Sequence, residues 1–418
     1  MSFTEQNISL WGEDIPWLSG LRQKGRQAFT HCGWPTAKNE AWKYTAFSPE
    51  KLHNPQIIHE NRHCSADCHC RHNHSPFPFK VYTVEFCNGQ LHDENFADDL
   101  PQGITIKSLA EAIYDGEAQK YLGKSFAMEN FPFAALNTAY IEQGVMILVE
   151  KNHQLDAPLY VHYHVHDEAD CFCNIRNLII LESNASATII EHYEADKNAA
   201  YFTNAVNEIF LNNSANLQHY TWQNEALEAH HVALNSVQLR TDSSYNSFIL
   251  QNECATSRHE SFINLQQRGA AAEVNGVYRL QNNGVSDITT NIRHLAESTY
   301  SNQLVKGVVN GQAKGVFQGQ IHIAPDAINT EGHQLHRALL LSNSAEIDCK
   351  PELEIFADDV QCSHGATCGD LDPEQMFYMQ TRGIDENTAR QLLITAHLQE
   401  VIEKIPQQNI KDWFLQLI

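Results

Sequence analysis

The sequence has no long apolar run and little positive charge. No stretch of about 18 apolar residues occurs, so a membrane-spanning helix is not expected. The N-terminal stretch MSFTEQNISLWGEDIPWL has neither a basic start nor an apolar core, so no secretory signal is expected. Lys and Arg number 28 against 51 Asp and Glu, a net charge of −23. Because an acidic surface repels phosphate backbones and anionic lipid, we expect neither nucleic acid nor a membrane as partner.

Sequence fingerprints of common catalytic sites are also missing. No G-x-S-x-G, H-E-x-x-H or dinucleotide-binding motif occurs. Gly123-Lys124-Ser125 resembles the end of a phosphate-binding loop, but Ala118 stands where that motif requires glycine. The residues before it favour a helix, whereas a phosphate loop follows a strand. We interpret the match as chance and expect no nucleotide hydrolysis by this chain.

Cysteine and histidine, by contrast, are plentiful. The 11 cysteines are scattered and odd in number, which is typical of reduced thiols in the cytoplasm and not of a disulfide framework. The sequence also has 23 histidines. The hydrophobic fraction of 42% and charged fraction of 19% are ordinary for a soluble globular protein. These totals predict a cytoplasmic protein in which metal chemistry is worth testing.

Residues 145–369 predict a domain of short β-strands. Apolar runs alternate with polar turns, and turn signals at Asn184, Asn213, Ser243, Asn283, Asn310 and Asn343 are separated by 29, 30, 40, 27 and 33 residues. A loose repeat of this length favours a solenoid, here a parallel β-helix. An ordinary β-sandwich stays open as an alternative, although hairpin folds usually show turn signals every 8–12 residues.

The flanking regions have a different texture. Residues 1–144 predict a mainly helical domain with a few short strands, including helices over 16–32 and near 109–122 and strands near 81–87 and 104–106. Residues 370–418 predict a helical domain with one helix from Asp385 to Lys404. That helix has two apolar stripes, so it packs either on its own domain and a partner, or entirely inside its own domain.

Two clusters contain metal-ligand types. The first, at 63–74, includes Cys64, Cys68 and Cys70 among histidines and could hold zinc. We expect a loop there without tightly held metal, because so many thiols in so few residues rarely close a tetrahedral site.

The second cluster lies between residues 349 and 383. Cys362 and His364 alternate in a predicted strand, so they should share one face and could share a metal ion. Asp358, Asp359 and Cys368 are candidate third ligands. On spacing alone, a structural cysteine and a surface histidine fit this pattern better than a metal site does.

The same region resembles the SufD family, whose members belong to the SUF machinery for iron–sulfur cluster assembly. The resemblance is carried by KPELEIFADDVQCSHGAT (350–367) and LDPEQMFYMQTRGI (371–384), with support from NEAWKYT (39–45), ALNTAY (135–140), RHLAEST (293–299) and GVFQGQIHI (315–323). The paralogue SufB differs in having His-Glu-Ala-Thr where this chain has residues 364–367, HGAT.

The resemblance implies a right-handed parallel β-helix flanked by N-terminal and C-terminal helical domains. It implies a non-catalytic scaffold subunit that pairs with SufB, or with itself when isolated, and binds the SufC ATPase through its C-terminal helices. Cys362 and His364 would lie at the SufB interface and take part in forming the nascent cluster, with no cofactor bound stably. The resemblance gives no role to the 63–74 segment.

Two other classes of function remain as alternatives at this stage. A β-helix enzyme acting on polysaccharides would need clustered catalytic acids or bases in a groove. A zinc-binding adaptor would use Cys64, Cys68 and Cys70. An activity assay on acidic polysaccharides and an elemental analysis for zinc would separate these alternatives from the scaffold.

Overall fold

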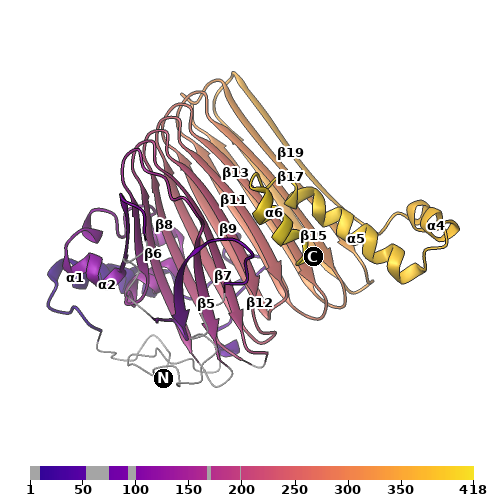
Figure 1. The fold of residues 1–418 in the computed structure, drawn as a ribbon, viewed down its shortest axis with the longest axis horizontal. Coiled ribbons are helices and arrows are strands. Elements are labelled where there is room, and N and C mark those ends of the chain that lie inside the picture. Colours follow the sequence, from indigo (N-terminus) through magenta and orange to yellow (C-terminus); the bar gives the residue numbers. More distant parts are fainter. Residues whose placement is uncertain (1–9, 53–74, 93–99, 167–170, 198) are drawn as a thin grey trace.

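The fold is a parallel β-solenoid of about eight turns with helices at both ends of the chain (Figure 1). The computed structural model describes residues 10–52, 75–92, 100–166, 171–197 and 199–418. Within these ranges the strands form a ten-stranded and a nine-stranded sheet. From residue 145 onward, successive strands alternate between the sheets, so each turn of the solenoid adds one strand to each sheet. The predicted fold class is therefore confirmed.

The ten-stranded sheet contains, in spatial order, β19 (Val360–Gly369), β17 (Thr330–Leu340), β15 (Tyr300–Val309), β13 (Ala271–Leu280), β11 (Ser244–Asn252), β9 (Asn216–Asn224), β7 (Ser186–Ala195), β5 (Leu159–Val165), β1 (Tyr82–Cys87) and β2 (Gln90–Leu91). The nine-stranded sheet contains β18 (Glu346–Ile355), β16 (Lys314–Ile323), β14 (Val285–His294), β12 (Thr256–Leu265), β10 (His230–Leu239), β8 (Phe202–Leu211), β6 (Phe172–Leu181), β4 (Val145–Val149) and β3 (Ile104–Ser108). The α-helices are α1 (Pro16–Cys32), α2 (Leu109–Tyr114), α3 (Pro132–Ala139), α4 (Pro373–Thr381), α5 (Glu386–Ile402) and α6 (Gln408–Leu415).

The uneven turn spacing in the sequence has a simple structural cause. Asn184, Asn213 and Ser243 lie in turns that lead from the nine-stranded to the ten-stranded sheet. Asn283 and Asn310 lie in turns that lead the other way. The long step of 40 residues from Ser243 to Asn283 passes over two turns, at 253–255 and 266–270, and marks the change from one row of turns to the other.

The interior of the solenoid is filled by alternate residues of every strand. Most are Val, Ile, Leu and Ala, as in the large cluster that contains Ile179, Ile209 and Val237. Polar residues inside the stack bond to their counterparts one turn away. Asn177, Asn207 and Asn235 form such a ladder, with Nδ2–Oδ1 distances of 2.9 and 2.8 Å. The ladder satisfies buried amides and holds neighbouring turns in register.

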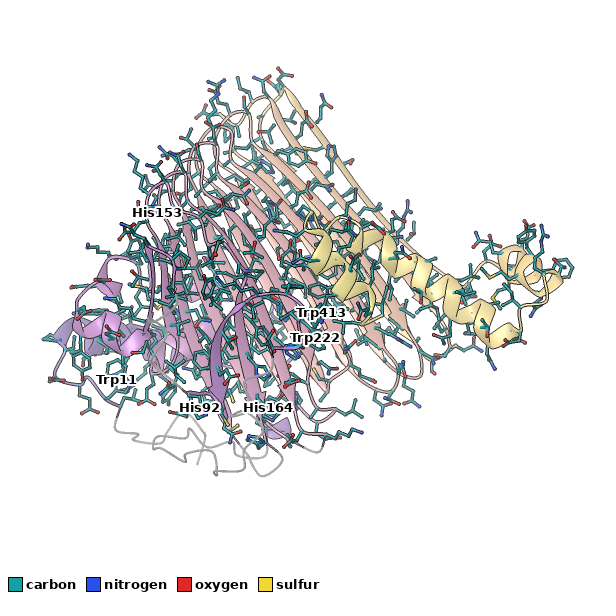
Figure 2. All side chains as sticks on the ribbon, viewed as in Figure 1. Trp11, His92, His153, His164, Trp222 and Trp413 are labelled. Carbon is teal, nitrogen blue, oxygen red and sulfur yellow. The ribbon has the colours of Figure 1, made fainter. Side chains whose placement is uncertain are left out.

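The terminal helices cover opposite outer faces (Figure 1). Phe133 of α3 packs on the nine-stranded sheet beside Phe202. Helices α5 and α6 lie on the ten-stranded sheet, where Trp413 of α6 meets Trp222 of β9 with ring centroids 4.8 Å apart (Figure 2). No helix within the described ranges is both long and apolar enough to span a membrane.

The two ends of the solenoid differ. At the first end, β3 pairs antiparallel with β4 and β2 pairs antiparallel with β1, so the first strands are closed by the N-terminal region. At the last end, β18 and β19 are the terminal strands of their sheets. Edge strands of this kind present unpaired N–H and C=O groups that can pair with another chain.

Candidate functional site at the last turn of the solenoid

Cys362 and His364 lie on β19, the last strand of the ten-stranded sheet. Their register partners on β17 are Gly332 and Gln334, both buried inside the solenoid. The two side chains therefore share the inward face, as the alternation in the sequence predicted. Cys362 is half-buried against the apolar cluster around Ile321, whereas His364 is exposed because no further turn covers it.

A thiol–imidazole contact lies beside this row and was not foreseen. Cys349 of β18 places its Sγ atom 3.4 Å from Nδ1 of His336 on β17. The other nitrogen of His336, Nε2, lies 2.8 Å from the hydroxyl of Tyr278. These side chains form a polar line from the interior to the last turn. No pattern in the sequence indicated this contact, because only the strand register brings Cys349 and His336 together.

Burial sets the protonation of these groups. It raises the pKa of the Cys362 thiol and raises that of Cys349 to about 12, the latter with support from Cys368 and Asp348. Burial lowers the pKa of His336 to about 4, so its imidazole is neutral at physiological pH. In the isolated chain both thiols are therefore protonated at neutral pH, and either must lose its proton to become a metal ligand.

The three candidate third ligands lie in two different places, one on β19 and two in the loop before it. Cys368 aligns with Ala338 of β17, so it lies on the inward face with Cys362 and His364, and it is exposed. Asp358 and Asp359 lie in the exposed loop between β18 and β19. The fold thus groups Cys368 with the Cys362 and His364 row and leaves the two carboxylates on the preceding loop.

The Gly-Lys-Ser segment has a structural role. The backbone N–H groups of Gly123, Lys124 and Ser125 donate to the carboxylate of Glu208 at 2.6, 3.0 and 3.0 Å. Arg176 completes the arrangement with an Nη2–Oε1 distance of 2.7 Å, and both charged side chains are fully buried. Backbone donors of the kind that bind a phosphate are thus occupied by a carboxylate of the same chain.

The C-terminal helix has one buried and one open stripe. Ile394, Leu398 and Val401 of α5 pack in a cluster on the ten-stranded sheet. On the opposite side, Leu392 is 46% exposed, and α4 before it exposes Phe377 by 68%. The version of the prediction in which both stripes are internal is therefore wrong.

A cleft of about 460 Å³ lies between these helices and the sheet; its lining includes Leu341, Leu371, Met376, Phe377, Gln380 and Arg390. Cys64, Cys68 and Cys70 lie outside the described residues.

These features define a class: a β-helical protein whose last turn is an open edge that carries thiol and imidazole groups. Residues 164–397 match the family model of the SufBD core domain of the SUF system for iron–sulfur cluster assembly, and residues 2–161 match the model of the SufBD N-terminal region. The chain belongs to the SufBD family, on its SufD side, and has a role in iron–sulfur cluster assembly in the SUF system.

Individual relatives agree with this membership. The chain is 30% identical to the iron–sulfur cluster assembly protein SufD of Escherichia coli, over 95% of this chain and 91% of the relative. It is 31% identical to a SufBD family protein of Synechocystis, over 80% and 76% of the two chains. The SufD protein of Bacillus subtilis is 28% identical, over 72% and 69%.

Proposed function

We propose that this chain is a non-catalytic scaffold subunit that pairs with a SufB-like paralogue through the last turn of its solenoid. We further propose that Cys362 and His364 hold iron or a nascent cluster at that interface. The observation that carries the proposal is the inward-facing row of Cys362, His364 and Cys368 on an edge strand.

The pairing is supported by the character of the last turn. Strands β18 and β19 end their sheets, and a related solenoid could continue both sheets across the interface. Ile355 and Phe356, which end β18 and begin the next loop, are 41% and 60% exposed. Apolar side chains beside unpaired strand edges are typical of surfaces that another protein covers.

Cluster chemistry is supported by the ligand types. Thiolate and neutral imidazole are both ligands of iron in proteins. An exposed ligand pair on an edge strand is incomplete alone, and a partner would supply the remaining ligands. Such a shared site would hold a cluster during its assembly and release it when the subunits move, which suits a transient cargo.

The ATPase is proposed to be a separate SufC-like chain. The Gly-Lys-Ser segment is occupied by Glu208 and offers no phosphate site. Phe377, Tyr378 and Leu392 form an exposed apolar surface on α4 and α5, which suits a protein partner. We expect no ATP hydrolysis by the pure chain. Robust hydrolysis that disappears in Lys124→Ala would contradict this.

The central experiment replaces His364 with alanine. The variant should fold and bind its SufB-like and SufC-like partners, yet fail to restore cluster assembly in a suf-deficient strain. His333→Ala is the matched control, because His333 lies on the neighbouring strand and bonds to Ser363 of β19 at 2.8 Å. His333→Ala should complement fully. Full complementation by His364→Ala would refute the ligand role.

Cys362→Ala should have a milder effect than His364→Ala if Cys368, six residues further along the same inward face, supplies the thiol in its place. The double variant Cys362→Ala/Cys368→Ala should then resemble His364→Ala in the same complementation assay. A double variant no worse than Cys362→Ala alone would show that Cys368 is not the substitute.

The partner surfaces can be tested separately. Phe356→Asp should weaken binding of the SufB-like partner, and Leu392→Asp should weaken binding of the SufC-like ATPase, each in a pull-down. Both side chains are exposed, so neither change should affect folding. If each variant retains both partners, the assigned surfaces are wrong.

A further inference from the structure

A second group of potential ligands lies on the outside of the solenoid, near its first end. On β5, Val161 and Tyr163 point inward, so His162 and His164 point outward. Their register partners on β7 are His192 and Glu194. We call His162, His164, His166, His192, Glu194 and Asp196 the outer histidine cluster. His164 is labelled in Figure 2, well away from the last turn.

Two histidines of the cluster converge on one carboxylate. Nε2 of His162 lies 2.7 Å and Nδ1 of His164 lies 3.3 Å from Oε1 of Glu194. One donor atom from each of these residues lies within 4.8 Å of the other two. All three side chains are only partly accessible, at 13, 11 and 32%.

His164 also belongs to a second group. Its Nε2 atom lies 3.2 Å from Nδ1 of His166 and 3.5 Å from Oδ1 of Asp196. Donor atoms about 3.3 Å apart are what a tetrahedral ion with bonds of about 2.0–2.1 Å requires. His164 belongs to both groups of potential ligands.

His192 is an independent sign that the arrangement is incomplete. Its relative exposure is only 2%, and within the part of the chain that the structure describes Nε2 has no hydrogen-bond partner. That atom lies 3.6 Å from Oε2 of Glu194. Nδ1 bonds to the Tyr160 hydroxyl at 2.7 Å, and the ring stacks on Trp222.

An ordinary histidine–carboxylate pair elsewhere in the chain gives the contrast. His322 of β16 and Glu354 of β18 have the same register relation and a 3.1 Å contact. Within the described residues, however, they form no group of three potential ligands. Register alone therefore produces such pairs, and the outer histidine cluster differs from them in how many donors converge.

We propose that the outer histidine cluster binds one divalent first-row transition-metal ion, with His162, His164 and Glu194 as its ligands. Two imidazoles and a carboxylate suit Zn²⁺ and Fe²⁺, and water would complete the coordination. His192, whose Nε2 atom lies 3.6 Å from Oε2 of Glu194, would then lie beside the site without binding the ion. This site is independent of Cys362 and His364 and does not rest on the proposed function.

The test uses the full chain, stripped with a chelator and dialysed. Titration calorimetry and elemental analysis with Zn²⁺, and anaerobically with Fe²⁺, should show one equivalent bound. His164→Ala and the isosteric Glu194→Gln should each weaken metal binding by about 100-fold or more. Mutating even a residue that only hydrogen-bonds to a ligand typically lowers metal affinity 10–100-fold. His322→Ala should bind as the unmodified chain does.

Three results would overturn the proposal. The first is unchanged binding in both His164→Ala and Glu194→Gln. The second is loss of the ion in a Cys64/Cys68/Cys70 triple serine variant while His164→Ala retains it. The third is loss in His166→Ala but not in His162→Ala, which would reject the assigned ligands. Circular dichroism of each variant ensures that lost binding does not reflect unfolding, and Glu194→Gln preserves side-chain volume.

Discussion

The first and last turns of the solenoid have the same register between strands, but their histidines lie on different faces of the strand. On β5 the histidines face outward, and the inward positions belong to a filled core. On β19, Cys362 and His364 occupy inward positions, yet no further turn covers them. Position along the solenoid, more than residue type, therefore decides whether an inward-facing side chain is core or available to a partner.

The largest loss in the free energy of unfolding should come from breaking the buried ion pair between Arg176 and Glu208. Glu208→Ala would leave Arg176 charged and fully buried, together with three backbone donors without an acceptor. We expect a loss of about 3–5 kcal/mol in the free energy of unfolding. Denaturant titration measures it, and Glu346→Ala, which removes the exposed partner of Lys314, serves as control. A cost equal to the control would contradict the buried-pair interpretation.

His336, which lies beneath the last turn, should make the free energy of unfolding fall at acid pH. Burial lowers its pKa to about 4, below the ordinary value of about 6.5 for an unfolded chain. The unfolded state therefore binds more protons between these values, and stability falls as the pH falls. Near pH 5 this one group should cost about 2 kcal/mol relative to neutral pH. His336→Gln should reduce the pH dependence of unfolding; an unchanged slope between pH 7.5 and 5 would disprove the assignment.

The buried asparagine ladder and the exposed row on β19 should differ in how much stability an alanine substitution removes. Asn207 lies in the middle of the buried asparagine ladder, so Asn207→Ala should cost about 1–3 kcal/mol. His364 is inward-facing but exposed, so His364→Ala should stay within about 0.5 kcal/mol. Thermal melting compares them. A large drop for His364→Ala would favour a structural role over the ligand role.

The smallest effect on the fold should come from labelling thiols. Among the cysteines that the structure describes, Cys368 is exposed and should react first with iodoacetamide, before half-buried Cys362 and Cys349. Cys254 is buried and should stay unlabelled in the native state. Labelling of Cys368 alone should leave the melting temperature unchanged. Mass spectrometry assigns the order, and early labelling of Cys254 would show that the interior opens.

Local sequence signals predicted the elements well. The helix α1 has the predicted bounds, and Asp385 caps α5 by accepting from the Thr388 N–H at 3.0 Å. The strand-rich region and the shared face of Cys362 and His364 also followed from the sequence, because alternation is a property of a single strand. The short helices α3, α4 and α6 and the role of Gly123-Lys124-Ser125 as donors to Glu208 were not predicted.

By itself, the sequence determined the strand-rich region that favours a β-solenoid, the placement of Cys362 and His364 on one face of a strand and the absence of a phosphate-loop motif. Only the tertiary structure decided which turn is the last, and hence that His364 is exposed while Gln334, one turn earlier, is buried. It also decided that Cys349 meets His336 and that His162 and His164 meet Glu194. The physical reason is that these contacts join strands about 30 residues apart or different sheets, so they depend on register between turns, which no local pattern encodes.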